Sequence, residues 1–133
     1  MNSFVARCAA GWIAAAMALC AAESSAGQGT AVHNIFLTDA REIADANAVN
    51  RALSVVSSDA ASCRRSGGSA KACACRPTAG LRALQSAVDT AVARHPRWNA
   101  DDTFVNYTDP ANGLSVATSL PGLVRQLEAC SRR

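Results

Sequence analysis

The stretch CRRSGGSAKACACRP, residues 63–77, separates two long helical patterns and carries three of the cysteines of the chain. Its glycine, serine and proline residues are typical of a loop. Before it, apolar residues recur at every third or fourth position from Ile43 to Cys63, which predicts a first helix over residues 39–62. Thr38 is the expected N-cap of that helix, because its hydroxyl can accept a hydrogen bond from an N–H group of the first turn.

After this loop, the sequence predicts two further helices and a short hairpin. A stripe of leucine, valine and alanine predicts a helix over residues 78–95, which ends because Pro96 cannot extend the hydrogen-bond ladder. Two β-branched and aromatic runs around a Pro-x-Asn-Gly turn predict a hairpin over residues 103–118. A last apolar stripe predicts a helix over residues 119–130. We therefore expect a mostly α fold of about three helices with a minor β-hairpin, stapled by two disulfides.

The N-terminus has the composition of a secretory signal peptide. Arg7 supplies the positive charge, residues 8–22 are apolar and uncharged, and small residues follow. The apolar run is shorter than the roughly 20 residues that a membrane-spanning helix needs. We expect a signal peptide over residues 1–26, cleaved after Ala26 or, as the second choice, after Ala22.

The rest of the chain has the size of one domain. We expect a loose N-terminal segment over residues 27–37, a single disulfide-stapled domain over residues 38–130 and a tail over residues 131–133. The composition is typical of a bacterial exported protein, so we expect a periplasmic or secreted location without stable membrane insertion after the signal is removed. The net charge of +3 is too small to indicate a nucleic-acid partner.

Cysteine usage supports this interpretation. Two of the six cysteines lie in the expected signal peptide, and the four that remain are Cys63, Cys73, Cys75 and Cys130. An even number in a small exported domain predicts a disulfide framework. A Cys73–Cys75 bond would close a very tight, strained ring. Two pairings stay open: 63–73 with 75–130, and 63–75 with 73–130.

The loop and the start of the next helix are basic. The loop contains Arg64, Arg65, Lys71 and Arg76 and no acidic residue, and Arg82 follows in the next helix. Together with the N–H groups at the start of a helix, they are a candidate anion-binding site. The competing interpretation, which we favour, is a solvated loop whose cations keep the protein soluble, because the glycines lack the spacing of a phosphate-binding loop.

No motif in the chain indicates catalysis or a resident cofactor. Cys73 and Cys75 could form a thiol-redox pair or a soft-metal clip, but their spacing is not the Cys-x-x-Cys of redox folds. The two histidines, His33 and His95, lack nearby zinc ligands, and His95 is better placed to end a helix. No serine stands in a nucleophile-elbow motif. We expect a non-enzymatic protein without a cofactor or metal.

The second half of the chain is similar to a known family. Residues 73–130 contain Cys75-Arg76-Pro77, a predicted helix over residues 81–94, His95-Pro96 and a last predicted helix ending at Cys130. With these features they resemble small periplasmic immunity proteins of the Rap/Tai type. In that family a C-terminal cysteine staples the last helix, and the proteins protect bacteria from type VI secretion toxins. The resemblance implies a protein partner, and it assigns no binding residues.

The leading hypothesis is therefore an exported binding protein, such as an inhibitor or immunity factor, with a protein partner of unknown identity. The alternatives are a thiol-redox or metal-handling protein using Cys73 and Cys75, and an anion-binding envelope module using the basic loop over residues 64–76. Trp98, with its aromatic neighbours in the hairpin, either folds back onto the core, which we favour, or belongs to an exposed recognition patch.

Overall fold

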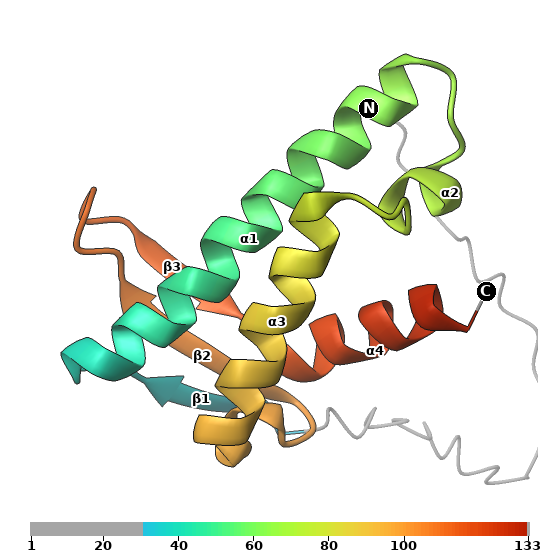
Figure 1. The fold of residues 1–133 in the computed structure, drawn as a ribbon. Coiled ribbons are helices and arrows are strands. Elements are labelled where there is room, and N and C mark those ends of the chain that lie inside the picture. The colour runs from blue at the N-terminus through green and yellow to red at the C-terminus, as the bar shows by residue number, and fades with distance from the viewer. Residues whose placement is uncertain (1–30, 133) are drawn as a thin grey trace, which may run out of the picture.

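The computed structural model describes residues 31–132, so the expected signal peptide over residues 1–26 lies outside the described residues. Along the chain the elements are β1 (His33–Phe36), α1 (Ala40–Arg65), α2 (Ala70–Ala74), α3 (Ala79–Arg94), the 3-10 helix η1 (Pro96–Asn99), β2 (Thr103–Thr108), β3 (Ser115–Thr118) and α4 (Leu120–Ser131). The expected fold class is confirmed: the described chain is mostly helical, with a small sheet and two disulfides. Figure 1 shows the sheet near one end of α1 and α2 at the other.

Helix α1 begins one residue later and ends three residues later than its apolar stripe predicts. Its N-cap is Asp39, not Thr38, because the Asp39 carboxylate accepts hydrogen bonds from two N–H groups of the first turn, at 2.8 and 3.1 Å. The hydrogen bond from the Glu42 N–H, and after it the one from the Arg41 N–H, lower the pKa of Asp39 below its ordinary value. At the other end the helix stops before Gly67, whose backbone is left-handed.

A short helix lies inside the region that the sequence analysis treats as loop. Helix α2 is capped by Ser69, whose hydroxyl accepts a hydrogen bond from the backbone N–H of Ala72 at 3.2 Å. The prediction of an irregular segment over residues 64–77 is therefore wrong for residues 70–74. The sequence Ala-Lys-Ala-Cys-Ala consists mostly of good helix formers, and the flanking glycine and proline signals conceal so short an element.

Helices α3 and α4 confirm the predicted positions to within one residue at each end. Thr78 caps α3 by accepting a hydrogen bond from the Leu81 N–H at 3.1 Å, and His95 occupies the C-cap position that the sequence indicates. The chain then makes the 3-10 turn η1 in place of a plain loop. Ser119 caps α4, because its hydroxyl accepts a hydrogen bond from the N–H of Gly122 at 3.4 Å.

The sheet has the order β1-β2-β3, with β1 parallel and β3 antiparallel to the central β2. The β2–β3 pair confirms the predicted hairpin, and its turn ends at Gly113, which has a positive φ. The prediction of a loose segment over residues 27–37 is wrong for His33–Phe36, which form β1. The error has a physical source: β1 pairs with residues 103–106, a partner too distant in sequence for any local pattern to reveal.

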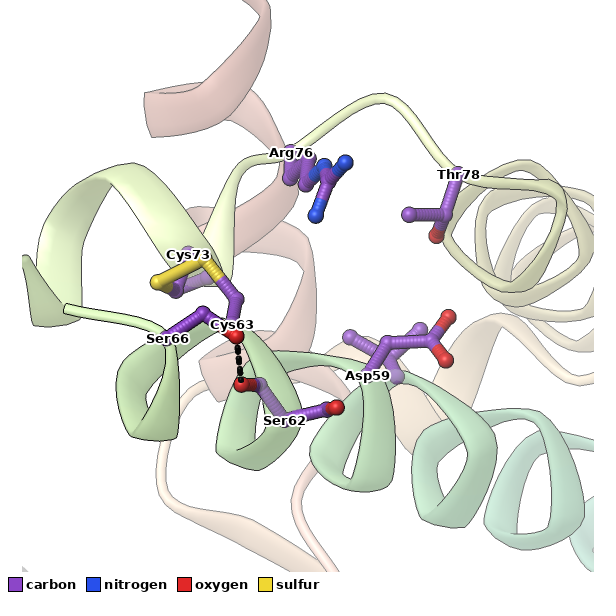
Figure 2. A pocket seen from close by; sticks show the side chains of 9 residues that line it. Asp59, Ser62, Cys63, Ser66, Cys73, Arg76 and Thr78 are labelled. Atoms are coloured by element: carbon purple, nitrogen blue, oxygen red, sulfur yellow. Dashed lines mark hydrogen bonds between the residues drawn. A yellow bond between two sulfur atoms is a disulfide. The ribbon is translucent and has the colours of Figure 1, made fainter. Parts of the chain in front are cut away.

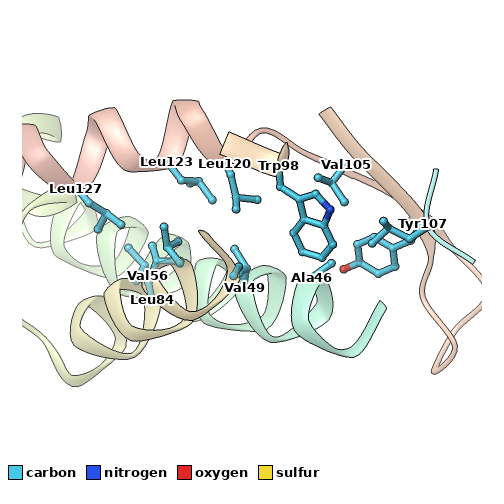
Figure 3. Packing of buried hydrophobic residues seen from close by; sticks show 13 residues of the cluster. Ala46, Val49, Val56, Leu84, Trp98, Val105, Tyr107, Leu120, Leu123 and Leu127 are labelled. Atoms are coloured by element: carbon cyan, nitrogen blue, oxygen red, sulfur yellow. The ribbon is translucent and has the colours of Figure 1, made fainter. Parts of the chain in front are cut away.

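The core fills the space between α1, α3, α4 and the inner face of the sheet. Trp98 is 1% exposed, so the prediction that it folds back onto the core is confirmed. Figure 3 shows its indole beside Val105 of β2 and Ala46 of α1. On the side away from the sheet the buried side chains are aliphatic, such as Val56, Leu84 and Leu127. No helix within residues 31–132 is long and apolar enough to cross a membrane.

Candidate functional site

We call the ends of α1 and α4, together with α2 and the start of α3, the stapled end. One disulfide joins Cys63 of α1 to Cys73 of α2, and the other joins Cys75, just after α2, to Cys130 of α4. The first of the two open pairings is therefore the one observed. Each disulfide joins two different parts of the fold, and Cys73 and Cys75 do not pair with each other. No group of three or more metal-ligating side chains stands together within residues 31–132.

The cations of the proposed anion site share this end but do not converge. Arg64 and Arg65 end α1, and Lys71 lies on α2, all exposed. Arg76 lines a cavity beneath the loop between α2 and α3. Arg82 lines a separate groove beside the Cys75–Cys130 disulfide. The structure therefore distributes five positive charges over one end of the molecule without directing them at one ligand position.

The cavity at Arg76 contains an acidic residue that the sequence analysis missed. It has a volume of about 330 Å³, and its lining includes Asp59, Ser62 and Thr78 besides Arg76. Figure 2 shows the Arg76 guanidinium and the Asp59 carboxylate facing it from two sides. Asp59 precedes Cys63 by one helical turn, a spacing that places both on the same face of α1. That spacing is the signal that could have revealed it.

Glycine permits two close approaches around this cavity. A Cβ atom on Gly68 would lie 2.5 Å from the Cys73 sulfur and 2.7 Å from the Cys63 sulfur. A Cβ atom on Gly80, in the first turn of α3, would lie 2.9 Å from Val55 and 3.1 Å from the Asp59 carboxylate. The close packing around the first disulfide requires glycine at position 68, and the close approach of α3 to α1 requires glycine at position 80.

At the opposite end, His95 links α3 to the start of α1. Its Nε2 lies 2.9 Å from the Asp45 carboxylate, and its Nδ1 lies 3.9 Å from Glu42. The imidazole stacks on Trp98, with ring centroids 4.0 Å apart, and Arg94 also pairs with Asp45 at 2.9 Å. Each of these side chains contacts another member of the cluster, so we interpret the cluster as a structural contact that holds α3 against α1.

A second polar network fixes β2 against α1. The Tyr107 hydroxyl donates to Asn47 Oδ1 at 3.2 Å, and the Asn47 amide donates to Asp109 Oδ1 at 3.4 Å. Burial raises the pKa of the Tyr107 phenol above its ordinary value of 10.0, and the Asp109 carboxylate raises it further. The network supplies hydrogen-bond partners to the buried Asn47 side chain.

The face of the sheet that points away from the helices carries exposed aromatic side chains. Phe36 of β1 is 75% exposed and Phe104 of β2 is 37% exposed. The parallel register pairs Asn34 with Phe104 and Phe36 with Asn106, so the four side chains alternate on one surface. An amide–amide hydrogen bond of 3.0 Å joins Asn106 to Asn34 across it. We call this surface the outer sheet face.

Strand β1 also presents a backbone edge that no other described strand covers. The N–H groups of His33 and Leu37 donate to carbonyls at the β2 side. Because backbone groups alternate in direction along a strand, those of Asn34 and Phe36 point away from β2. No local pattern in residues 27–37 predicts this edge, because the partner strand lies far along the chain.

The strands themselves contain no lysine, arginine, aspartate or glutamate. The charged residues within three positions of a strand end are all acidic: Asp39, Asp101, Asp102 and Asp109. The edge and the outer sheet face therefore carry no acidic or basic strand residue and are bordered by acids, one of which, Asp101, pairs with Arg125 at 3.7 Å. Proteins usually protect such an edge with lysine, proline or a bulge, and β1 has none of these.

Comparison of the chain with protein-family models, with curated proteins and with solved structures finds no match to any of them.

Proposed function

We propose that this protein is an exported, non-enzymatic binding protein, periplasmic or secreted, that inhibits or neutralises a protein partner by pairing with an extended segment of it. Two disulfides favour an oxidising compartment. The resemblance of residues 73–130 to Rap/Tai immunity proteins supports a protein partner. The expected signal peptide over residues 1–26 supports export.

The observation that carries the proposal is the open edge of β1 beside the exposed Phe36. An extended peptide can add to such an edge, where main-chain hydrogen bonds supply affinity and alternate side chains supply specificity. The outward backbone groups of Asn34 and Phe36 provide the hydrogen bonds. Phe36 and Phe104 provide an apolar surface on one side of the added strand.

The chemistry of this surface defines the partner segment. Uncharged strand residues require a segment that is uncharged over about four residues, with apolar side chains at alternate positions. Of the bordering acids, Asp39 and Asp102 favour lysine or arginine just outside that stretch, whereas Asp101 already pairs with Arg125 at 3.7 Å. We therefore propose a partner loop or terminus in which a short β-prone segment is flanked by basic residues.

All four described cysteines are paired, and the five cations of the basic loop do not surround one cavity. We therefore do not advance the thiol-redox function or the envelope anion-binding function as the main role. Titration of accessible thiols in the native protein tests the first of these directly. The proposal predicts no reactive thiol, whereas thiols reacting before denaturation would revive the redox interpretation.

A peptide-display selection on the purified, oxidised protein tests the proposed edge. Expected is enrichment of segments that alternate apolar residues and carry flanking lysine or arginine. Asn34→Pro removes an outward N–H without removing a bond to β2, so it should abolish binding of the enriched peptides. The matched control is Asn106→Ala, which removes the same side-chain hydrogen bond but leaves the edge backbone intact.

Two results would contradict the proposal. One is the absence of any enriched pattern, and the other is equal binding of the enriched peptides to the wild type and to Asn34→Pro. The export claim has its own test, in which the full chain is expressed in a Gram-negative host and the N-terminus of the periplasmic product is sequenced. It should begin at residue 27 or 23, and an uncleaved cytoplasmic chain would contradict export.

A further inference from the structure

The cavity at the stapled end contains two opposite charges that do not neutralise each other. Asp59 and Arg76 both line it, and neither side chain takes part in an ion pair or side-chain hydrogen bond within residues 31–132. Both residues are exposed, so water solvates each charge, and a direct ion pair between them would gain little. Here they stand on separate walls, which leaves each one available to a ligand.

The backbone holds the two walls in place. Asp59 lies within the long helix α1, and its carboxylate lies over the first turn of α3, where Gly80 has no side chain to displace it. Arg76 follows Cys75 directly, and its backbone N–H donates to the Cys73 carbonyl at 3.4 Å. Arg76 therefore directly follows the segment that both disulfides hold, which limits the movement of its backbone toward α1.

The remaining lining fits a small polar molecule. Hydroxyl groups of Ser62 and Thr78 lie along the cavity, while Val56 and the Cys63–Cys73 disulfide supply an apolar part. A volume of about 330 Å³ lies at the lower end of the range of small-molecule sites, roughly 300–1,000 Å³. The space therefore suits a molecule of amino-acid size rather than a nucleotide or a peptide strand.

From these contacts we infer that the cavity binds a small zwitterion, with its carboxylate against Arg76 and its ammonium group against Asp59. A planar guanidinium can receive a carboxylate through two parallel hydrogen bonds. A simple anion would approach the Asp59 carboxylate as well, and a simple cation would approach Arg76. A molecule carrying both charges satisfies both walls, so this inference replaces the pure anion site that the basic loop alone indicates. It is independent of partner binding at β1.

Isothermal titration of the oxidised protein with zwitterions of increasing charge separation tests the inference. The series is glycine, β-alanine, γ-aminobutyrate and ε-aminocaproate, with acetate and butylammonium as singly charged controls. Expected is measurable binding that peaks at one chain length and exceeds that of both controls. Arg76→Gln and Asp59→Asn should each weaken the best zwitterion at least about tenfold, the loss expected for one charge-assisted hydrogen bond.

The matched control is Arg82→Gln, which removes an exposed cation at the same end but outside the cavity, and should leave affinity unchanged. Fluorescence of the buried Trp98 confirms that each variant is folded. Acetate or butylammonium binding as tightly as every zwitterion would overturn the inference. So would the absence of heat with any zwitterion at millimolar concentrations, or a double-mutant cycle showing that Asp59 and Arg76 stabilise each other in the ligand-free protein.

Discussion

The stapled end and the end that holds the sheet are stabilised by different means. At the sheet end, Trp98, Val105 and Tyr107 are buried together, and hydrogen bonds from Tyr107 and His95 join the elements without any covalent link. At the stapled end the chain is rich in alanine, glycine and serine, and Cys73 is its buried side chain on α2. The comparison teaches that disulfides compensate here for thin apolar burial.

The largest expected effect concerns the sheet end. Trp98→Ala removes a side chain that is 1% exposed and leaves a large cavity. Such a change costs about 5 kcal/mol of unfolding free energy, the upper end of the range for buried aromatic residues. Urea denaturation followed by circular dichroism measures it. A cost below about 1 kcal/mol would mean that the sheet end does not depend on this burial.

The next effect concerns the staple between the second and fourth helices. The Cys75–Cys130 bond closes a loop with a sequence separation of 55, against 10 for Cys63–Cys73. Chain-entropy reasoning gives the longer loop about 4 kcal/mol and the shorter one about 3 kcal/mol. Paired alanine variants of each bond, compared in the same denaturation assay, check the order. A larger loss from the shorter loop would contradict it.

A smaller effect isolates the packing around the first disulfide. Gly68→Ala places a Cβ atom 2.5 Å from the Cys73 sulfur, so the chain or the disulfide must shift, at a cost of about 1–3 kcal/mol. Gly122→Ala is the matched control, because its Cβ atom meets only ordinary contacts of 3.4 Å or more. We expect the control to be neutral or slightly stabilising. Equal destabilisation of both variants would remove the steric explanation.

The smallest effect is a pH dependence at the sheet end. Because burial raises the pKa of Tyr107 in the folded chain, its contribution to stability is complete below pH 10 and is lost as pH rises through the folded value. Tyr107 is the single tyrosine of the chain, so phenolate absorbance reports it alone. The midpoint of the phenolate titration should lie at higher pH in the folded protein than in the urea-unfolded protein. Coincident midpoints would contradict the buried network.

The same hydrogen-bond network can be weakened by mutation: Asn47→Ala should reduce the free energy of unfolding by about 1 kcal/mol.

Local sequence patterns predicted the elements whose signals are local. The three long helices followed from apolar spacing, and the β2–β3 hairpin followed from its turn ending at Gly113. Strand β1 was missed because its parallel partner lies far along the chain, and α2 was missed because five residues carry little periodicity. The disulfide pairing stayed open because Cys73 and Cys75 have equal access to either partner until α2 directs the first toward α1.

The candidate sites show the same limit. Arg76 was identified from charge alone, but its opposing Asp59 lies on another element, and only the approach of α3 to α1 brings both to one cavity. Phe36 lies in a stretch without a local strand pattern, so the sequence alone does not predict that it is exposed beside an open strand edge. The residue types alone predict the chemistry of each surface, but only the tertiary contacts show which residues lie together on it.

Hydrogen exchange on the variant lacking the first disulfide, Cys63→Ala with Cys73→Ala, tests the contrast between the two ends most directly. If the disulfide holds the stapled end while burial holds the sheet end, the amides of α2 and the last turn of α1 lose protection. The amides of Val105 and Tyr107 keep theirs. Equal loss of protection at α2 and at β2 would show that the two ends form one cooperative unit, and would contradict the account.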